Sequence, residues 1–278
     1  MSAEGADGVR EFDGKVAFVT GGASGLGFAL ARAFGRANMR VMLADIEVGA
    51  LNAAVAELKG QGIDVRGIEC DVASRASVQH AASETLAAFG KIHLICNNAG
   101  VLAGGPMERI TPGDWDWVIG VELMGAVYGI QAFLPHLKAQ GEGGHVVTVA
   151  SMAGMLGVPG MGAHVAAKFG VVGLSETLAA ELAGTSIGVS VLCCSFMRTR
   201  MDNSARNRSE RYGPRTETSP AGEAQLATFV RLGKDPEEVA EKVMRGIKEN
   251  EMYIFTDPEL RSPLEERFQR ILAAYRQP

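Results

Sequence analysis

Three side chains that can handle protons stand close together in one part of the sequence. Ser151 follows an apolar run, His164 comes thirteen residues later, and Lys168 lies four residues beyond His164. Residues four apart share one face of a helix, so we expect His164 and Lys168 to point in the same direction. An imidazole, whose ordinary pKa is about 6.5, can give or take a proton near neutral pH. This group of residues therefore predicts proton transfer to or from a substrate.

A glycine-rich turn near the N-terminus predicts a nucleotide site. The sequence VTGGASGLG follows an apolar run and contains Gly21, Gly25 and Gly27. Glycines between a strand and a helix let a pyrophosphate approach the free N–H groups of the helix N-terminus. Asp45 stands 18 residues after Gly27, where its carboxylate can bind ribose hydroxyls and repel a 2′-phosphate. Because no Lys or Arg adjoins Asp45 or the glycines, we expect NAD(H) to be preferred over NADP(H).

Seven apolar runs alternate with helical segments along the chain. They cover residues 15–20, 40–45, 65–70, 92–97, 145–150, 188–193 and 252–255. Nearly continuous hydrophobic strands separated by helices predict a parallel sheet that is covered on both faces. Because there is no repeat and no linker, we expect residues 12–278 to form one α/β domain, with residues 1–11 as a flexible leader.

Some helix starts and one unusual segment can also be predicted. Thr111 before Pro112, and Asp235 at the start of a similar sequence, have the pattern of helix N-caps. A long helix is expected from about Asp114 to Lys138. Residues 198–226 are polar, charged and only weakly periodic, which is typical of a lid or binding loop, or else of a disordered surface loop. We expect residues 195–230 to form a substrate-binding loop or lid.

The glycine spacing, the sequence CDV at residues 70–72 and the sequence NNAG at residues 97–100 together resemble the short-chain dehydrogenase/reductase family. The resemblance extends over about residues 12–256. It implies a single-domain Rossmann fold, with a doubly wound, seven-stranded parallel sheet and helices on both faces. It also implies a homodimer or homotetramer that packs through long helices. The cofactor-binding residues that it implies are Gly21, Ser24, Gly25, Leu26, Gly27, Asp45, Asp71, Val72, Asn98, Ala99, Gly100, Lys168 and Thr199.

The resemblance is incomplete at the catalytic positions. In the family, a Ser orients the substrate oxygen, a Tyr transfers the proton, a Lys lowers the pKa of the Tyr and holds the nicotinamide ribose, and an Asn fixes a water molecule. Ser151 and Lys168 match this pattern, whereas His164 stands in place of the Tyr and Glu122 in place of the Asn. The Pro-Gly that is expected after the sixth strand is replaced by residues 194–195, Cys-Ser, which affects the loop over the nicotinamide.

Four functions fit these catalytic candidates. The first is hydride transfer at a C=O centre, in which Glu122 orients His164 or transfers the proton itself. The second is hydride transfer at a C=N centre, where an anion would stabilise an iminium cation. The others are a non-redox isomerase or cyclase that retains NAD, and an NAD-binding pseudoenzyme or scaffold. Tyr212, in the expected lid, could also supply a phenol.

The expected substrate is a medium-sized, largely apolar or aromatic small molecule. Its predicted contacts are Met152, Met155, Met161, Phe196 and Met201, all in segments expected at the carboxyl ends of the strands. Methionine forms adaptable apolar walls, although ordinary core filling is the alternative for about half of such residues.

Composition and charge also bear on the partners, the metal content and the cysteine chemistry of the protein. A net charge of −5 gives no indication of a nucleic-acid partner, and no apolar run approaches the roughly 20 residues of a membrane span. No cluster of His, Cys and Asp has the spacing of a metal site, so we expect no metal. Cys70, Cys96 and Cys193 lie in or beside apolar runs, so we expect buried free thiols, in keeping with a reducing cytoplasm.

Overall fold

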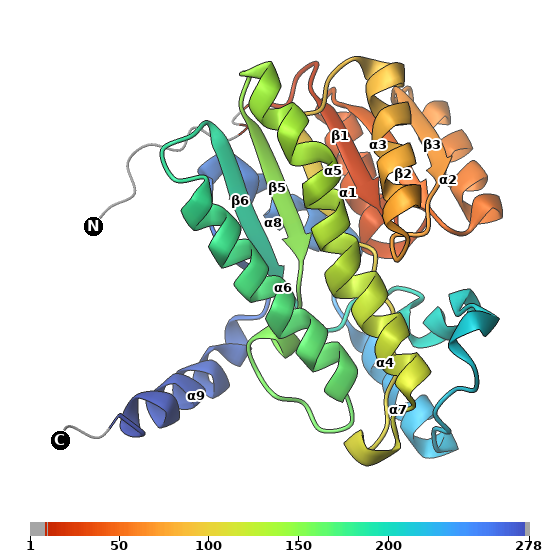
Figure 1. Ribbon diagram of the computed structural model, residues 1–278, viewed down its shortest axis with the longest axis vertical. Coiled ribbons are helices and arrows are strands. Elements are labelled where there is room, and N and C mark those ends of the chain that lie inside the picture. The colour runs from red at the N-terminus through yellow and green to blue at the C-terminus, as the bar shows by residue number, and fades with distance from the viewer. Residues whose placement is uncertain (1–8, 10, 276–278) are drawn as a thin grey trace.

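Seven parallel strands form the centre of the computed structural model, which describes residue 9 and residues 11–275 (Figure 1). The strands are β1 (Val16–Thr20), β2 (Arg40–Asp45), β3 (Val65–Glu69), β4 (Leu94–Asn97), β5 (Gly144–Val149), β6 (Ile187–Cys193) and β7 (Tyr253–Phe255). Their order in the sheet is β3-β2-β1-β4-β5-β6-β7. The chain therefore moves outward in both directions from the pair β1 and β4, and a ligand crevice is expected where the direction changes. The predicted doubly wound Rossmann fold is confirmed.

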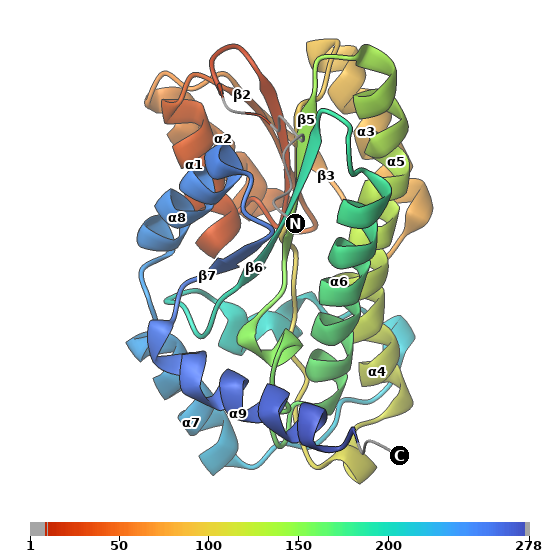
Figure 2. The ribbon, with the colours of Figure 1, turned by 90° about the vertical axis from the view of Figure 1, so that its left-hand side faces the viewer.

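Helices cover both faces of the sheet (Figure 2). One face carries α1 (Gly25–Arg36), α2 (Val48–Gly60) and α8 (Pro236–Glu249), and the other carries α3 (Arg75–Phe89), α5 (Gly125–Gln140) and α6 (Gly162–Glu181). Strands β1, β4, β5 and β6 are buried along their whole length. Two covered faces explain why these strands show continuous apolar runs rather than alternation.

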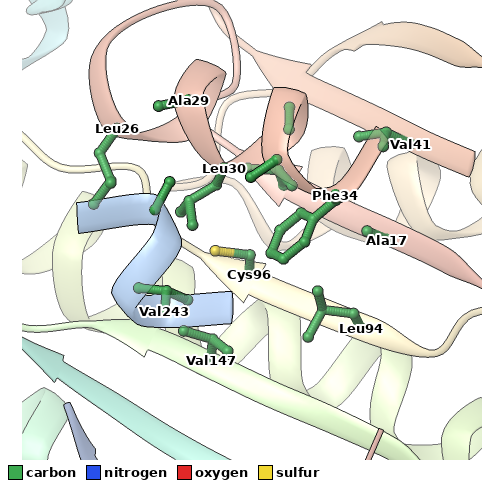
Figure 3. Close-up of a cluster of buried hydrophobic side chains, with 14 of the residues drawn as sticks. Ala17, Leu26, Ala29, Leu30, Phe34, Val41, Leu94, Cys96, Val147 and Val243 are labelled. Carbon is green, nitrogen blue, oxygen red and sulfur yellow. The ribbon is translucent and has the colours of Figure 1, made fainter. Parts of the chain in front are cut away.

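The core beneath α1 and α8 consists of buried apolar side chains (Figure 3). Leu30 and Phe34 of α1 and Val243 of α8 lie over Ala17 of β1 and Cys96 of β4. Burial raises the pKa of the Cys96 thiol to about 12, so this side chain stays neutral and behaves as a small apolar group. All four cysteines are free and buried, as predicted for three of them.

The helix predicted from Asp114 to Lys138 is a continuous run that contains an irregular turn. It begins with α4 (Pro112–Val118), where the Thr111 side chain accepts a hydrogen bond from the Asp114 N–H at 3.2 Å. The π-helical segment η2 (Ile119–Met124) then leads into α5, and Glu122 lies within η2. A π turn adds a residue to the helical turn and redirects the side chains near it.

By length and composition, the run Pro112–Gln140 could cross a membrane. In this fold, however, α5 packs against α3 and β4, and η2 packs against α6. Several apolar side chains of the run, among them Phe133 and Trp117, are buried in the core of the domain.

The segment of residues 195–230 is folded rather than disordered. It contains the 3₁₀ segments η4 (Met201–Asn207) and η5 (Glu210–Tyr212) and the start of α7 (Pro220–Leu232). Arg208 Nε donates to Asp114 Oδ1 at 2.7 Å, and the Thr216 N–H donates to Asp114 Oδ2 at 2.7 Å. Burial alone would raise the pKa of the Asp114 carboxyl, but Thr216 and Arg208 outweigh it and hold the pKa below its usual value. A buried charged group therefore anchors the segment to the start of α4.

The last described helix of the chain lies apart from the sheet (Figure 1). Helix α9 (Arg261–Ala273) projects from the body, and none of its residues is buried. Of the leader predicted over residues 1–11, Val9 is buried against the core and Glu11 is exposed. The other leader residues lie outside the described part of the chain.

Candidate active site

One large cavity, of about 580 Å³, opens at the carboxyl ends of the strands. Most of the predicted site residues line it: Gly21, Ser24, Gly25, Leu26, Asp45, Asp71, Val72, Asn98, Ala99, Gly100, Ser151, Met152, Met161, His164, Lys168, Phe196, Thr199 and Met201. Its size is within the range of ordinary ligand sites. Gly27, Glu122 and Met155 do not line the cavity, and each has a different position.

The glycine turn after β1 is shaped by close backbone contacts. Gly21 and Gly25 have φ values of +63° and +54°, which favour glycine. A Cβ atom on Gly27 would lie 2.1 Å from the carbonyl oxygen of Gly21. Any side chain at residue 27 would collide with the turn. Gly27 therefore packs against the turn without lining the cavity. The turn leads directly into the N-terminus of α1, which fits a nucleotide phosphate.

Asn98 ties the end of β4 to the same turn. Its Nδ2 donates to the carbonyl oxygens of Thr20 at 2.8 Å and Gly21 at 3.3 Å. Its backbone N–H donates to Thr20 Oγ1 at 2.9 Å. The Asn98 side chain is thus used to hold the turn in shape, in addition to lining the cavity.

Asp45 lies at the end of β2, with its carboxylate fixed by two backbone donors. Its Oδ2 accepts from the Ala23 N–H at 2.9 Å and its Oδ1 from the Glu47 N–H at 3.0 Å. These bonds join the glycine turn to the loop after β2. The carboxylate is held in the cavity wall, where a nucleotide ribose is expected.

The structure also brings basic residues to this end, which the sequence argument missed. Arg206 Nη2 donates to Glu47 Oε1 at 2.6 Å, and Arg206 Nε lies 3.2 Å from Glu47 Oε2. Arg200 Nη2 is 3.8 Å from Glu47 Oε2. The Arg206 guanidinium lowers the pKa of the Glu47 carboxyl below its usual value. Because Arg206 is 159 residues from Glu47, no local pattern could have revealed this contact.

A second arginine contact lies at the end of β3. Arg211 Nη2 donates to Asp71 Oδ2 at 3.0 Å and to the Tyr212 hydroxyl at 2.8 Å. The Arg211 guanidinium also lies over the Tyr212 ring, 4.8 Å from its centroid. Tyr212 does line the cavity, but its hydroxyl is engaged by Arg211 beside Asp71.

At the other end of the cavity, Ser151, His164 and Lys168 lie together. Ser151 follows β5, and His164 and Lys168 stand one turn apart on α6. The backbone N–H of Ala153 donates to Ser151 Oγ at 3.1 Å. Lys168 Nζ donates to the carbonyl oxygen of Val149 at 2.8 Å. Backbone groups of the β5 end therefore fix both polar side chains.

Glu122 is directly behind His164. Glu122 Oε1 lies 3.0 Å from His164 Nδ1 and 3.7 Å from Lys168 Nζ. The Glu122 side chain is 0% exposed, and its Oε2 has no hydrogen-bond partner within residues 11–275. The two departures from the expected family pattern therefore contact each other.

The charge of Glu122 decides the tautomer of His164. Burial alone would raise the pKa of the Glu122 carboxyl, but His164 and Lys168 outweigh it and hold the pKa below its usual value. Glu122 is thus ionised near neutral pH. A carboxylate only accepts hydrogen bonds, so His164 Nδ1 must carry the proton in this bond. In the neutral imidazole, Nε2 then has a free lone pair.

The loop after β6 is held by Asp257, which the sequence argument did not identify. The Ser195 N–H donates to Asp257 Oδ2 at 3.0 Å, and Ser195 Oγ donates to Oδ1 at 2.5 Å. Lys234 Nζ is 3.3 Å from Asp257 Oδ1. Burial alone would raise the pKa of this carboxyl, but Ser195 and the other donors outweigh it and lower the pKa. This clamp fixes the loop in which the expected Pro-Gly is absent.

The remaining wall of the cavity is apolar. Phe196 stacks on Phe229, with ring centroids 5.3 Å apart. Other apolar lining residues are Leu102, Trp117, Val121, Met152, Leu156, Val158, Met161, Met201 and Leu260. The prediction of Met155 as a substrate contact is wrong. Met155 belongs to a buried core cluster with Val171 and Val172 of α6, so it is unavailable to a ligand in the cavity.

Comparison with known proteins links this geometry to a family. The family model described as short chain dehydrogenase matches residues 15–210. The chain is 38% identical to the C alpha-dehydrogenase of Sphingobium sp. (strain NBRC 103272 / SYK-6), over 95% of this chain and 87% of the relative. It is 32% identical to the 1-deoxy-11-beta-hydroxypentalenate dehydrogenase of Streptomyces avermitilis, over 91% of this chain and 88% of the relative.

A solved structure agrees with the sequence matches. A short chain dehydrogenase/reductase from Burkholderia phymatum, crystallised in complex with NAD, superimposes with a TM-score of 0.92 and 39% identity. The match covers 96% of this chain and 98% of that protein. Sequence and fold are therefore shared along almost the whole length.

Proposed function

The chain belongs to the short-chain dehydrogenase/reductase family, and we propose that it transfers hydride reversibly between NAD(H) and an alcohol or ketone, with His164 as the proton-transfer group. The observation that carries this proposal is the 3.0 Å contact between His164 Nδ1 and the buried Glu122 carboxylate. It supports a dyad in which the carboxylate orients the imidazole and leaves Nε2 for the substrate.

The end of the cavity that is formed by the glycine turn, Asp45 and Asp71 is called the adenosine end. Its residues fit an NAD molecule. The tight turn that Gly27 permits leads into the N-terminus of α1 and supports a phosphate site there, and the NAD-bound Burkholderia relative supports the same cofactor here. We propose that Asp45 binds the adenosine ribose and Lys168 the nicotinamide ribose. The charge of Asp45 supports a preference for NAD(H), since a 2′-phosphate would be repelled. When bound, this cofactor accepts a hydride from the carbinol carbon or returns one to the carbonyl carbon.

In this proposal, side chains of the protein transfer the proton. In alcohol oxidation, Ser151 would orient the substrate hydroxyl and His164 Nε2 would accept its proton. Glu122 would then stabilise the imidazolium through Nδ1, while Lys168 balances the carboxylate before the proton arrives. Positioned acid–base catalysis of this kind contributes roughly 10²–10⁴-fold to rates. In ketone reduction the same imidazolium donates the proton.

The position of Glu122 argues against the C=N alternative. An anion that stabilises an iminium cation must reach the cavity, but Glu122 lies behind His164 and does not line it. Its charge is also balanced by Lys168 at 3.7 Å. One relative is named as the dehydrogenase of a hydroxy compound, which supports chemistry on an alcohol. We therefore favour alcohol and ketone substrates.

The cavity wall supports a medium-sized, largely apolar or aromatic substrate. Met152, Met161, Phe196 and Met201 supply apolar surface beside Ser151 and His164, and residues 195–230 form the outer wall. We propose that this segment acts as the substrate-binding loop or lid. We also propose a homodimer or homotetramer packed through the long helix, and a cytoplasmic location that the buried free cysteines support.

The test is turnover of NAD(H) across pH with matched substrates. Aromatic secondary alcohols, the corresponding ketones and cyclic imines of similar size would each be assayed by nicotinamide absorbance. We expect oxidation of alcohols to be favoured at higher pH, because it releases a proton, and reduction of ketones at lower pH, because it consumes one. Turnover of imines alone would refute the substrate class. Tight NADH binding without turnover of any substrate would favour a scaffold.

A further inference from the structure

The adenosine end carries a cluster of charges that spans two distant parts of the chain. Glu47, two residues after Asp45, accepts hydrogen bonds from Arg206 and from Asn207 Nδ2 at 2.9 Å. Arg206 Nη1 also donates to the carbonyl oxygens of Arg200 at 3.0 Å and Asn203 at 2.8 Å. The guanidinium is therefore held in one orientation by groups on both sides.

The cluster borders the site that Asp45 serves. The Glu47 N–H lies 3.0 Å from Asp45 Oδ1, and both residues line the same cavity as Arg200 and Arg206. Two carboxylates and two guanidiniums balance one another here. Without Glu47, two guanidiniums would face a single carboxylate beside the ribose position. A guanidinium is the side chain best suited to bind a phosphate through paired hydrogen bonds.

We propose that Glu47 is a second determinant of cofactor choice, because it neutralises two arginines that would otherwise attract a 2′-phosphate. The inference rests on the proposed NAD(H) function. It assigns the preference for NAD(H) to two carboxylates with different tasks. Asp45 repels the phosphate and binds ribose, whereas Glu47 keeps the arginines of residues 200–206 occupied.

Glu47 and Arg206 also fasten residues 200–207 to the loop after β2, and the test must separate that role from the effect of charge. Two substitutions break the same contact with opposite changes of charge. Glu47→Gln makes the cluster more positive, and Arg206→Gln makes it more negative. A purely structural fastening predicts that both variants alter NADH and NADPH binding alike. The charge proposal predicts opposite shifts in the ratio of the two dissociation constants.

The experiment is a fluorescence titration of the full-length protein with NADH and NADPH at low ionic strength. For Glu47→Gln we expect the ratio Kd(NADPH)/Kd(NADH) to fall about tenfold, since one unit charge near a phosphate has an effect of this order at a partly solvated site. For Arg206→Gln we expect the ratio to rise. The control Glu265→Gln changes the net charge equally, on α9 and outside the cavity, and should leave the ratio unchanged.

Three results would overturn the inference. The ratio could stay constant in both variants, it could move in the same direction in both, or Glu265→Gln could shift it as much as Glu47→Gln. The proposed function is tested separately by the unaltered protein. If that protein binds neither NADH nor NADPH, the proposed function itself is refuted, and the inference fails with it.

Discussion

The adenosine end of the cavity and its reacting end, where Ser151, His164 and Lys168 lie, are built in different ways. At the adenosine end, the backbone sets the shape: Gly21 and Gly25 take positive φ values, and Gly27 has no room for a Cβ atom. At the reacting end, side chains set the chemistry. Ser151 and Lys168 are fixed by backbone groups near the end of β5, and His164 is fixed by a buried carboxylate.

This difference explains why the departures from the expected family pattern lie at the reacting end. A site made by close backbone contacts tolerates little change, because each glycine is required by a steric limit. A site made by side chains can change if partners change together. His164 and Glu122 stand at two altered positions, and they contact each other at 3.0 Å. Lys168 keeps the buried carboxylate balanced, so the altered pair costs less than an unpaired charge would.

The largest effect is expected from His164→Ala. Loss of a positioned proton-transfer group should lower kcat about 10³-fold, within the range of general acid–base catalysis. NADH affinity should change by less than about twofold, because the adenosine end is untouched. Steady-state rates and NADH fluorescence titration measure the two quantities. The exposed His80 of α3 provides the control His80→Ala, which should leave both unchanged. Unaltered turnover in His164→Ala would refute the assigned role.

Gly27→Ala should have the opposite effect to His164→Ala: it should weaken NADH binding. The new Cβ atom would lie 2.1 Å from the Gly21 carbonyl oxygen, so the turn must shift. A strain of about 1–3 kcal/mol would weaken NADH binding by roughly 5- to 150-fold. Calorimetric titration with NADH measures this loss. Gly173→Ala is the matched control, because a Cβ atom on this residue of α6 meets nothing within 4 Å. Equal NADH affinity in both variants would show that the turn does not hold the nucleotide.

A smaller loss is expected from Glu122→Gln, which keeps the shape of the side chain and removes its charge. The imidazolium of His164 would lose its anionic partner, so we expect a fall in kcat of about 30-fold. Affinity for NADH should change little, because Glu122 does not line the cavity. Steady-state rates and NADH titration measure the two quantities. A loss of NADH affinity as large as the loss of kcat would mean that Glu122 only supports packing.

Much of the fold could be predicted because it depends on local pattern. All seven strands begin and end within two residues of the predicted apolar runs. The two predicted N-caps are confirmed, since Thr111 and Asp235 accept hydrogen bonds from the N–H groups of Asp114 and Glu237. Apolar runs and cap residues act over a few neighbouring positions, which a sequence displays directly.

The contacts that decide function could not be predicted in the same way. Glu122 meets His164 across 42 residues, and Glu47 meets Arg206 across 159. No periodicity links such pairs, and Glu122 lies in a π-helical segment that has no sequence signal. No Lys or Arg adjoins Asp45 in the sequence. In the structure, however, Arg200 and Arg206 of another segment line the same cavity as Asp45. Met155 likewise joined the core, although its segment lies beside the cavity.

The smallest effect is expected from Asp45→Asn, and it tests whether the two ends act independently. The substitution removes the charge but retains an oxygen that accepts from the Ala23 or Glu47 N–H. We expect the ratio Kd(NADPH)/Kd(NADH) to fall about tenfold, because the repulsion of a 2′-phosphate is lost. With saturating NADH, kcat should stay unchanged, since Ser151, His164 and Lys168 keep their partners. Titrations with both nucleotides and rates at saturation measure these outcomes. A constant ratio would remove Asp45 as a determinant, and a fall in kcat would show that the adenosine end also positions the reacting groups.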